Sequence, residues 1–141
     1  MRKHILWILF LGVITLLFIS SCSEQEIKYQ RYYSDGLTLY KDHCQSCHMA
    51  DGTGLRGVIP PLSDTTFLKR NRDKLACIVK YGLDDTIVVN GETYQTPMPA
   101  ESHLAAIDIA KILTYITNTF GNEQGIYDVT EVEAALNKNC E

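Results

Sequence analysis

The sequence lacks an excess of positive charge, internal repeats and segments of disordered composition. Its 141 residues include 13 Lys and Arg against 17 Asp and Glu, a formal net charge of −4, without a basic stripe. These absences argue against a nucleic-acid partner and against a disordered chain. Hydrophobic residues make up 45% and charged residues 21% of the chain, which is ordinary for a globular protein. The length is that of a single domain.

The chain also lacks an apolar run long enough to cross a membrane as a helix. The run over residues 5–19 has 15 residues, whereas a spanning helix needs about 20. Basic residues precede it, as in a secretory signal peptide, and it ends in the sequence Ile19-Ser20-Ser21-Cys22. This ending resembles the lipobox of bacterial lipoproteins, in which the chain is cut before a cysteine that then carries lipid.

We therefore predict a lipoprotein-type signal peptide over residues 1–21, lipidation of Cys22 and a membrane tether over residues 22–33. Lipid chains on Cys22 would anchor the exported protein, because two lipid signals already give stable attachment. The expected location is the bacterial cell envelope, facing the periplasm, and Ser23 favours the outer over the inner membrane. The alternative is an uncleaved signal anchor.

The remaining chain contains one Cys-x-x-Cys-His run, formed by Cys44, Cys47 and His48. This spacing is the attachment signal for a c-type haem. Two thiols on one helical turn can each add to one vinyl group of the haem, and the following imidazole can bind the iron. The alternative is a zinc site built from the same three residues and another ligand. Zinc would fit a reducing compartment better than an exported chain.

Two further cysteines, Cys77 and Cys140, stand outside this motif. Export would permit a disulfide between them. Nothing in the sequence places the C-terminal tail near Cys77, however. We therefore expect Cys77 to be a small buried side chain on a helix and Cys140 to be a free thiol in the tail.

Met98 is the candidate for a second iron ligand. Met1 belongs to the signal segment and Met49 adjoins His48, so neither can reach the opposite face of the iron. Met98 lies 50 residues after His48, in a loop stiffened by the prolines on either side of it. His43 and His103 are the competing candidates for this position.

The expected secondary structure is mainly helical. We expect a first helix that begins after Ser34 or Asp35 and leads into the attachment run. Gly36 within it suggests close approach by another element. The remaining expected elements are a helical segment from residue 64 to 82, a small hairpin over residues 87–94, a helix from Ser102 to Phe120 and a short last helix capped by Thr130.

In this order the motifs resemble the class I c-type cytochromes, and the match covers residues 36–122. It rests on the runs Gly36-x-x-x-Tyr40-x-x-x-Cys44-x-x-Cys47-His48, Pro60-Pro61-Leu62 and Gly91-x-x-Tyr94-x-x-x-Met98-Pro99, and on a later helix containing Tyr115.

This resemblance implies an all-α, cytochrome c-like fold. Three main helices would wrap a covalently attached haem, with a small hairpin excursion and a short C-terminal helix. The domain would span residues 34–141, with a core of 34–122, and the first and last main helices would cross near Gly36 and Tyr115. The residues implied to bind the cofactor are Cys44, Cys47, His48, Pro60 through its carbonyl, Leu62, Tyr94 and Met98, while Tyr94 or Arg56 would contact the haem propionates.

The function expected is transfer of single electrons, with no catalytic residues and no small-molecule substrate. His and Met ligation suits electron transfer and leaves no open position on the iron. The segment before Tyr94 looks like cytochrome domains that serve membrane oxidases and quinoprotein dehydrogenases, so a terminal oxidase or a quinoprotein dehydrogenase is an expected partner. The alternatives are a peroxidase-like haem enzyme and a gas sensor in which Met98 dissociates.

Overall fold

The computed structural model describes residues 3, 7, 12, 24–138 and 140. Apart from residues 3, 7 and 12, the predicted signal peptide lies outside this set, as does Cys22. Within the described residues, none of the helices has the length and apolar character that a membrane crossing requires.

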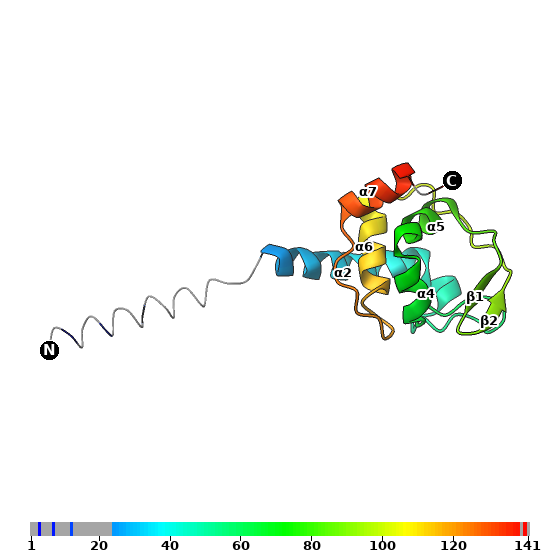
Figure 1. Ribbon diagram of the computed structural model, residues 1–141, viewed down its shortest axis with the longest axis horizontal. Coiled ribbons are helices and arrows are strands. Elements are labelled where there is room, and N and C mark those ends of the chain that lie inside the picture. Colours follow the sequence, from blue (N-terminus) through cyan, green and yellow to red (C-terminus); the bar gives the residue numbers. More distant parts are fainter. Residues whose placement is uncertain (1–2, 4–6, 8–11, 13–23, 139, 141) are drawn as a thin grey trace.

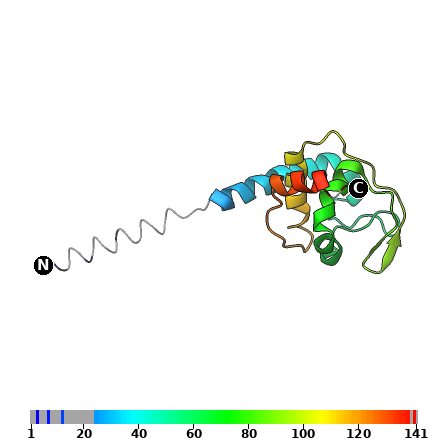
Figure 2. The same cartoon turned by 45° about the horizontal axis from the view of Figure 1, so that its top comes forward.

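The described chain is mainly helical, with one two-stranded sheet (Figure 1). This agrees with the expected cytochrome c-like fold. Helices gather on one side of the domain, and loops with the small sheet form the other side (Figures 1 and 2). The elements in chain order are α2 (Glu24–His43), α3 (Gln45–His48), α4 (Thr65–Arg70), a 3-10 turn (Arg72–Lys74), α5 (Leu75–Tyr81), β1 (Ile87–Val89), β2 (Glu92–Tyr94), α6 (Ala106–Ile116) and α7 (Val129–Lys138).

The close crossing of α2 and α6 forms the centre of the fold. A Cβ atom added to Gly36 would lie 2.1 Å from the carbonyl oxygen of Lys111 and 2.9 Å from the Cβ of Tyr115, so only glycine allows this approach. The ring of Tyr115 lies 5.2 Å from the rings of both Tyr33 and Tyr40, measured between centroids. The predicted crossing near Gly36 and Tyr115 is therefore confirmed.

Helix α2 begins earlier than the sequence suggested. It starts at Glu24, not after Ser34 or Asp35, so most of the segment interpreted as an irregular tether is helical. Tyr32 is buried in the core cluster, and Lys28 forms an ion pair with Asp128 just before α7. These contacts with distant parts of the chain stabilise the first turns, and the short local pattern did not reveal them.

The two later helices differ from expectation at their ends. Helix α6 begins at Ala106 instead of Ser102 because the preceding residues form a turn, in which Leu104 N donates to the Glu101 carbonyl. It ends at Ile116, before Phe120. At the start of α7 the Asp128 carboxylate accepts a hydrogen bond from the Thr130 backbone N–H, so Asp128 caps this helix instead of Thr130.

The predicted hairpin is confirmed and is tied to α4. Strands β1 and β2 pair antiparallel around the turn at Asn90 and Gly91. The Asp64 carboxylate accepts hydrogen bonds from the backbone N–H groups of Thr66 and Phe67, which caps α4, and from that of Asn90 at 2.9 Å. Burial alone would raise the pKa of Asp64, but these hydrogen bonds hold it below its ordinary value.

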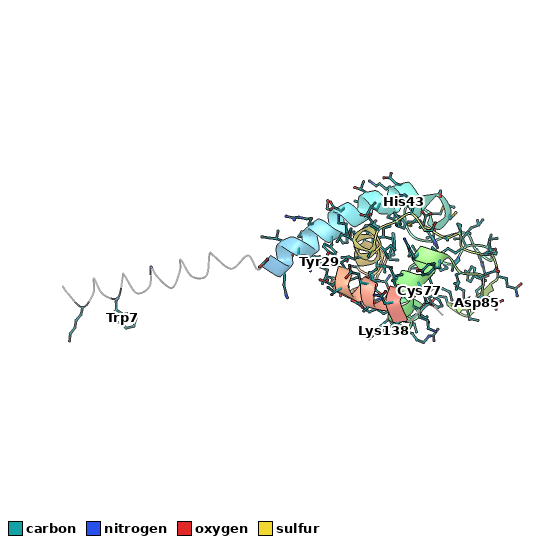
Figure 3. The ribbon with its side chains drawn as sticks, turned by 90° about the horizontal axis from the view of Figure 1, so that it is seen from above. Trp7, Tyr29, His43, Cys77, Asp85 and Lys138 are labelled. Atoms are coloured by element: carbon teal, nitrogen blue, oxygen red, sulfur yellow. A yellow bond between two sulfur atoms is a disulfide. The ribbon has the colours of Figure 1, made fainter. Side chains whose placement is uncertain are left out.

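Cys77 is buried on α5 as expected, but the expectation that Cys77 and Cys140 are unpaired is wrong, because the two form a disulfide. Helix α7 packs against α5 and α6 (Figure 2), which returns the tail to the helix that carries Cys77. Figure 3 shows Cys77 on α5 beside the end of α7 at Lys138. The Cα atoms of the two cysteines lie 5.3 Å apart across a sequence separation of 63 residues. The tail is thus covalently held to the domain.

This disulfide predicts a stability loss when it is removed. The Cys140→Ser variant should lose about 2–4 kcal/mol of unfolding free energy, because the unfolded chain regains the freedom of a long loop. Urea denaturation followed by far-UV circular dichroism measures the loss. Addition of dithiothreitol to the wild-type protein should lower its stability to the level of the variant and leave the variant unchanged. Equal stability of the variant and the wild-type protein under oxidising conditions would contradict a stabilising disulfide between Cys77 and Cys140.

Candidate haem-binding site

A cavity of about 290 Å³ lies between the attachment run, the hairpin and helices α4, α5 and α6. Most of its wall is apolar. Asp85 is the one acidic or basic side chain other than histidine among the described residues that line it. The structure brings every predicted cofactor-binding residue to this one wall, namely Cys44, Cys47, His48, Pro60, Leu62, Tyr94 and Met98.

The two thiols lie on one turn between the end of α2 and the end of α3. The backbone N–H groups of Cys47 and His48 both donate to the Cys44 carbonyl, at 3.2 and 2.9 Å, which keeps the turn compact. Cys44 is partly buried, and its burial, followed by the nearby Glu101 and Cys47, raises the pKa of the Cys44 thiol to about 12. Cys44 is therefore a neutral thiol near neutral pH, and both cysteines are free of disulfides.

His48 is held in one orientation by the proline loop. Its Nδ1 lies 3.2 Å from the carbonyl oxygen of Pro60. A carbonyl only accepts hydrogen bonds, so Nδ1 carries the proton and Nε2 keeps its lone pair for a metal. Burial lowers the pKa of His48, although the hydrogen bond to Pro60 opposes this effect. The ring is therefore neutral near neutral pH, which is the state that binds iron.

Met98 is fixed by backbone contacts with the end of α5. Leu83 N donates to the Met98 carbonyl at 3.0 Å, and Met98 N donates to the Leu83 carbonyl at 2.8 Å. Gly82 adopts a positive φ of 81° there, and a Cβ on it would lie 2.5 Å from the Met98 carbonyl oxygen. Sequence reasoning missed Gly82 and Leu83 as positioning residues. The only local signal was a glycine just after the helical pattern.

The remaining predicted residues shape the wall in different ways. Leu62 is held in place by the buried Asn122, whose side-chain amide donates to the Leu62 carbonyl at 2.8 Å. The hydroxyl of Tyr94 donates to the Glu92 carboxylate at 3.2 Å, and burial, then this contact, raises the pKa of Tyr94. Arg56 does not line the cavity: its side chain is 93% exposed and pairs with Glu92. Arg56 and Tyr94 thus both contact Glu92, and a contact of either with a propionate stays a prediction.

The competing candidate ligands lie elsewhere. Neither His43 nor His103 is among the described residues that line the cavity, and their rings lie beside one another 5.2 Å apart. Besides the carboxylate of Asp85, the wall thus offers two free thiols, one imidazole nitrogen and one thioether sulfur. Two thiols for covalent attachment, two axial ligands for an iron and an apolar surround for a flat macrocycle fit a haem.

Comparison with known proteins gives the same result. The Cytochrome c family model matches residues 33–120, more than half of the chain. Cytochrome c-552 of Thermus thermophilus is 29% identical over 97 residues, which cover 66% of this chain and 73% of that protein.

Two cytochrome subunits of dehydrogenases are also similar. The fructose dehydrogenase cytochrome subunit of Gluconobacter japonicus is 32% identical over 108 residues, covering 71% of this chain and 21% of the subunit. The cytochrome c subunit of the quinone alcohol dehydrogenase of Gluconobacter oxydans is 30% identical over 91 residues, covering 62% of this chain and 18% of the subunit. The chain thus spans about a fifth of each of these longer proteins.

With its helical fold, its single Cys-x-x-Cys-His turn facing an apolar cavity and these matches, the chain belongs to the cytochrome c family as a class I c-type cytochrome with covalently bound haem c.

Proposed function

We propose that this protein carries single electrons between membrane-associated redox partners. Cys44 and Cys47 would hold the haem through thioether bonds, and His48 and Met98 would supply the two side-chain ligands of its iron. The observation that carries the proposal is the meeting of two free thiols, an oriented imidazole and a thioether on the wall of one apolar cavity. Haem c supplies an iron that alternates between the ferrous and ferric states.

The residues around the cavity support this role by holding both ligands still. The Pro60 carbonyl keeps the proton on Nδ1 of His48 and raises the basicity of the nitrogen that binds iron. The two hydrogen bonds to Leu83 hold the Met98 backbone in place. A thioether ligand favours the ferrous state and raises the reduction potential. With His48 and Met98 both bound to the iron, no position would be left for a substrate, and the protein would act as a carrier and not as an enzyme.

Exposed apolar side chains in segments that border the cavity suit brief contacts with a partner. Leu55 and Val58 are exposed in the loop that leads to Ile59 and Pro60 on the cavity wall, and Val88 is exposed on β1. Exposed apolar side chains next to a cofactor favour docking with little burial. Encounters of this kind are weak, and the surface area that they bury is small for a protein–protein interface.

The partner proposed is a quinoprotein dehydrogenase or a terminal oxidase. The similarity of this chain to the cytochrome subunits of a fructose dehydrogenase and a quinone alcohol dehydrogenase supports a dehydrogenase as the partner. Lipidation of Cys22 would hold the domain on the periplasmic face of an envelope membrane, with the outer membrane favoured. Confinement to that surface raises the effective concentration of the carrier near membrane partners.

Covalent attachment predicts that haem stays with the protein during acid–acetone extraction. Thioether bonds survive this treatment, whereas axial ligation alone does not. The absorbance of the precipitated protein and of the acetone phase measures the distribution. The Cys44→Ser/Cys47→Ser variant should release any haem it holds into acetone. Release of haem from the wild-type protein would contradict attachment at these two thiols.

Ligation by Met98 predicts a spectral change in the Met98→Ala variant. The weak ferric absorption band from sulfur-to-iron charge transfer should disappear, and the reduction potential should fall, because the thioether no longer favours the ferrous state. Spectra of the oxidised protein and a redox titration measure both effects. Met49→Ala is the matched control and should keep the band and the potential. An unaltered band in Met98→Ala would show that another group binds the iron.

The anchor is tested by changing Cys22. Cys22→Ala should move the protein from the membrane fraction to the soluble fraction, because the site of lipid attachment is lost. Cell fractionation followed by haem staining measures the distribution, and Cys140→Ser is the control that should stay with the membranes. If Cys22→Ala remains in the membrane fraction, residues 1–21 act as an uncleaved anchor instead.

A further inference from the structure

A second group of potential metal ligands lies outside the haem cavity. His43, Glu101 and His103 each offer one ligand atom, and these three atoms all lie within 4.8 Å of one another. His43 is the last residue of α2, directly before Cys44, and Figure 3 labels it at that end of the helix. Glu101 and His103 lie in the turn that follows the Met98 segment. The group therefore joins the two parts of the chain that carry the haem ligands.

The distances within the group are those of a metal site. One oxygen of Glu101 lies 3.4 Å from Nδ1 of His43 and 3.7 Å from Nδ1 of His103. Zinc binds nitrogen and oxygen at about 2.0–2.2 Å, so adjacent ligands of a tetrahedral zinc stand roughly 3.3–3.5 Å apart. A shift of the side chains that brings the two imidazole nitrogens closer together would place the three atoms around one ion.

Ion pairing alone explains this arrangement poorly. Two ion pairs to the one Glu101 oxygen would need both rings to be protonated, and the rings of His43 and His103 lie 5.2 Å apart, so their like charges would repel each other. A divalent cation removes this conflict, because it attracts the carboxylate and both neutral rings at once. Two imidazoles and one carboxylate are a common donor set for zinc.

The backbone around the group is already held in place. Glu101 N donates to the Val79 carbonyl at 3.0 Å, and the Lys80 ammonium donates to the carbonyls of Ser102 and Leu104, both at 2.7 Å. These bonds fix the turn on α5. The side chains of His43 and Glu101 are 25% and 21% exposed, whereas that of His103 is 64% exposed. His43 and Glu101 are therefore largely enclosed by the protein, and the group is open to solvent at His103.

We propose that His43, Glu101 and His103 bind one divalent transition-metal ion, of which Zn²⁺ is the best match, with water as the fourth ligand. The bound ion would link the C-terminal end of α2 to the turn after Met98. It would thus hold the two sides of the haem cavity together without lining the cavity. A metal that binds only the folded protein also stabilises the fold. This site is independent of the electron-transfer role.

The test is calorimetric titration of the untagged holoprotein with ZnCl₂ near neutral pH. We expect saturation at one Zn²⁺ per protein. His103→Ala and Glu101→Gln should each weaken binding by about 10-fold to 100-fold or more, because even loss of an outer-shell partner of a metal ligand has that effect. Glu133→Gln, which removes an exposed carboxylate from α7, is the control and should bind as the wild-type protein does. The haem absorption of every variant shows whether its fold is retained.

Two further measurements separate this site from weak surface binding. X-ray absorption at the zinc edge should show nitrogen and oxygen ligands and no sulfur, which excludes binding at cysteine. Zn²⁺ should raise the Tm of the wild-type holoprotein and have little effect on that of His103→Ala. Absence of stoichiometric binding, or equal binding and equal stabilisation in His103→Ala, would overturn the proposal and leave the group as a set of ion pairs. Neither result depends on haem attachment or on Met98.

Discussion

The close crossing of α2 and α6 at Gly36 is the constraint on which the rest of the structure depends. The absence of a side chain there lets the Lys111 carbonyl and Tyr115 approach the α2 backbone directly. Because α2 runs without interruption to His43, this crossing sets where the attachment run stands relative to Ile112, Leu113 and Ile116 on the cavity wall. A wider crossing would move the two thiols away from the apolar surface that they face.

The opposite side of the cavity has a different origin. Met98 lies outside helices and strands, and its position comes from pairing with Leu83 across Gly82 at the end of α5. Asp64 links the hairpin to α4 in a similar way, through backbone N–H groups rather than apolar contacts. A soft ligand on a loop can be placed as firmly as one on a helix when its backbone groups are paired. Under the proposed ligation of the iron by Met98, a side chain that stays in place would keep the iron in one coordination state.

The outer parts of the chain stabilise this centre from a distance. The early turns of α2 reach Asp128 through Lys28, and α7 is fixed by the Cys77–Cys140 disulfide and by a pair of hydrogen bonds between Arg72 and Glu131. These contacts bind the two ends of the domain to its middle. The group of His43, Glu101 and His103 adds a link of the same kind beside the haem cavity.

The sequence by itself determined the chemistry of the site and the order of its parts. Three features carried this information: the spacing of Cys44, Cys47 and His48, the proline run, and the position of Met98. They reflect covalent chemistry and local backbone stiffness, and both of these can be recognised from residues that are close together in the sequence. The hairpin, the helices that became α2, α6 and α7, a helical stretch between residues 64 and 82, and the glycine at the helix crossing were readable for the same reason.

The tertiary structure decided what depends on contacts between distant residues. It alone extended α2 back to Glu24, paired Cys77 with Cys140 and brought His43 beside Glu101 and His103. Each of these follows from burial or pairing across tens of residues. Local propensity carries no information about such contacts, because their free energy exists only once the chain has folded.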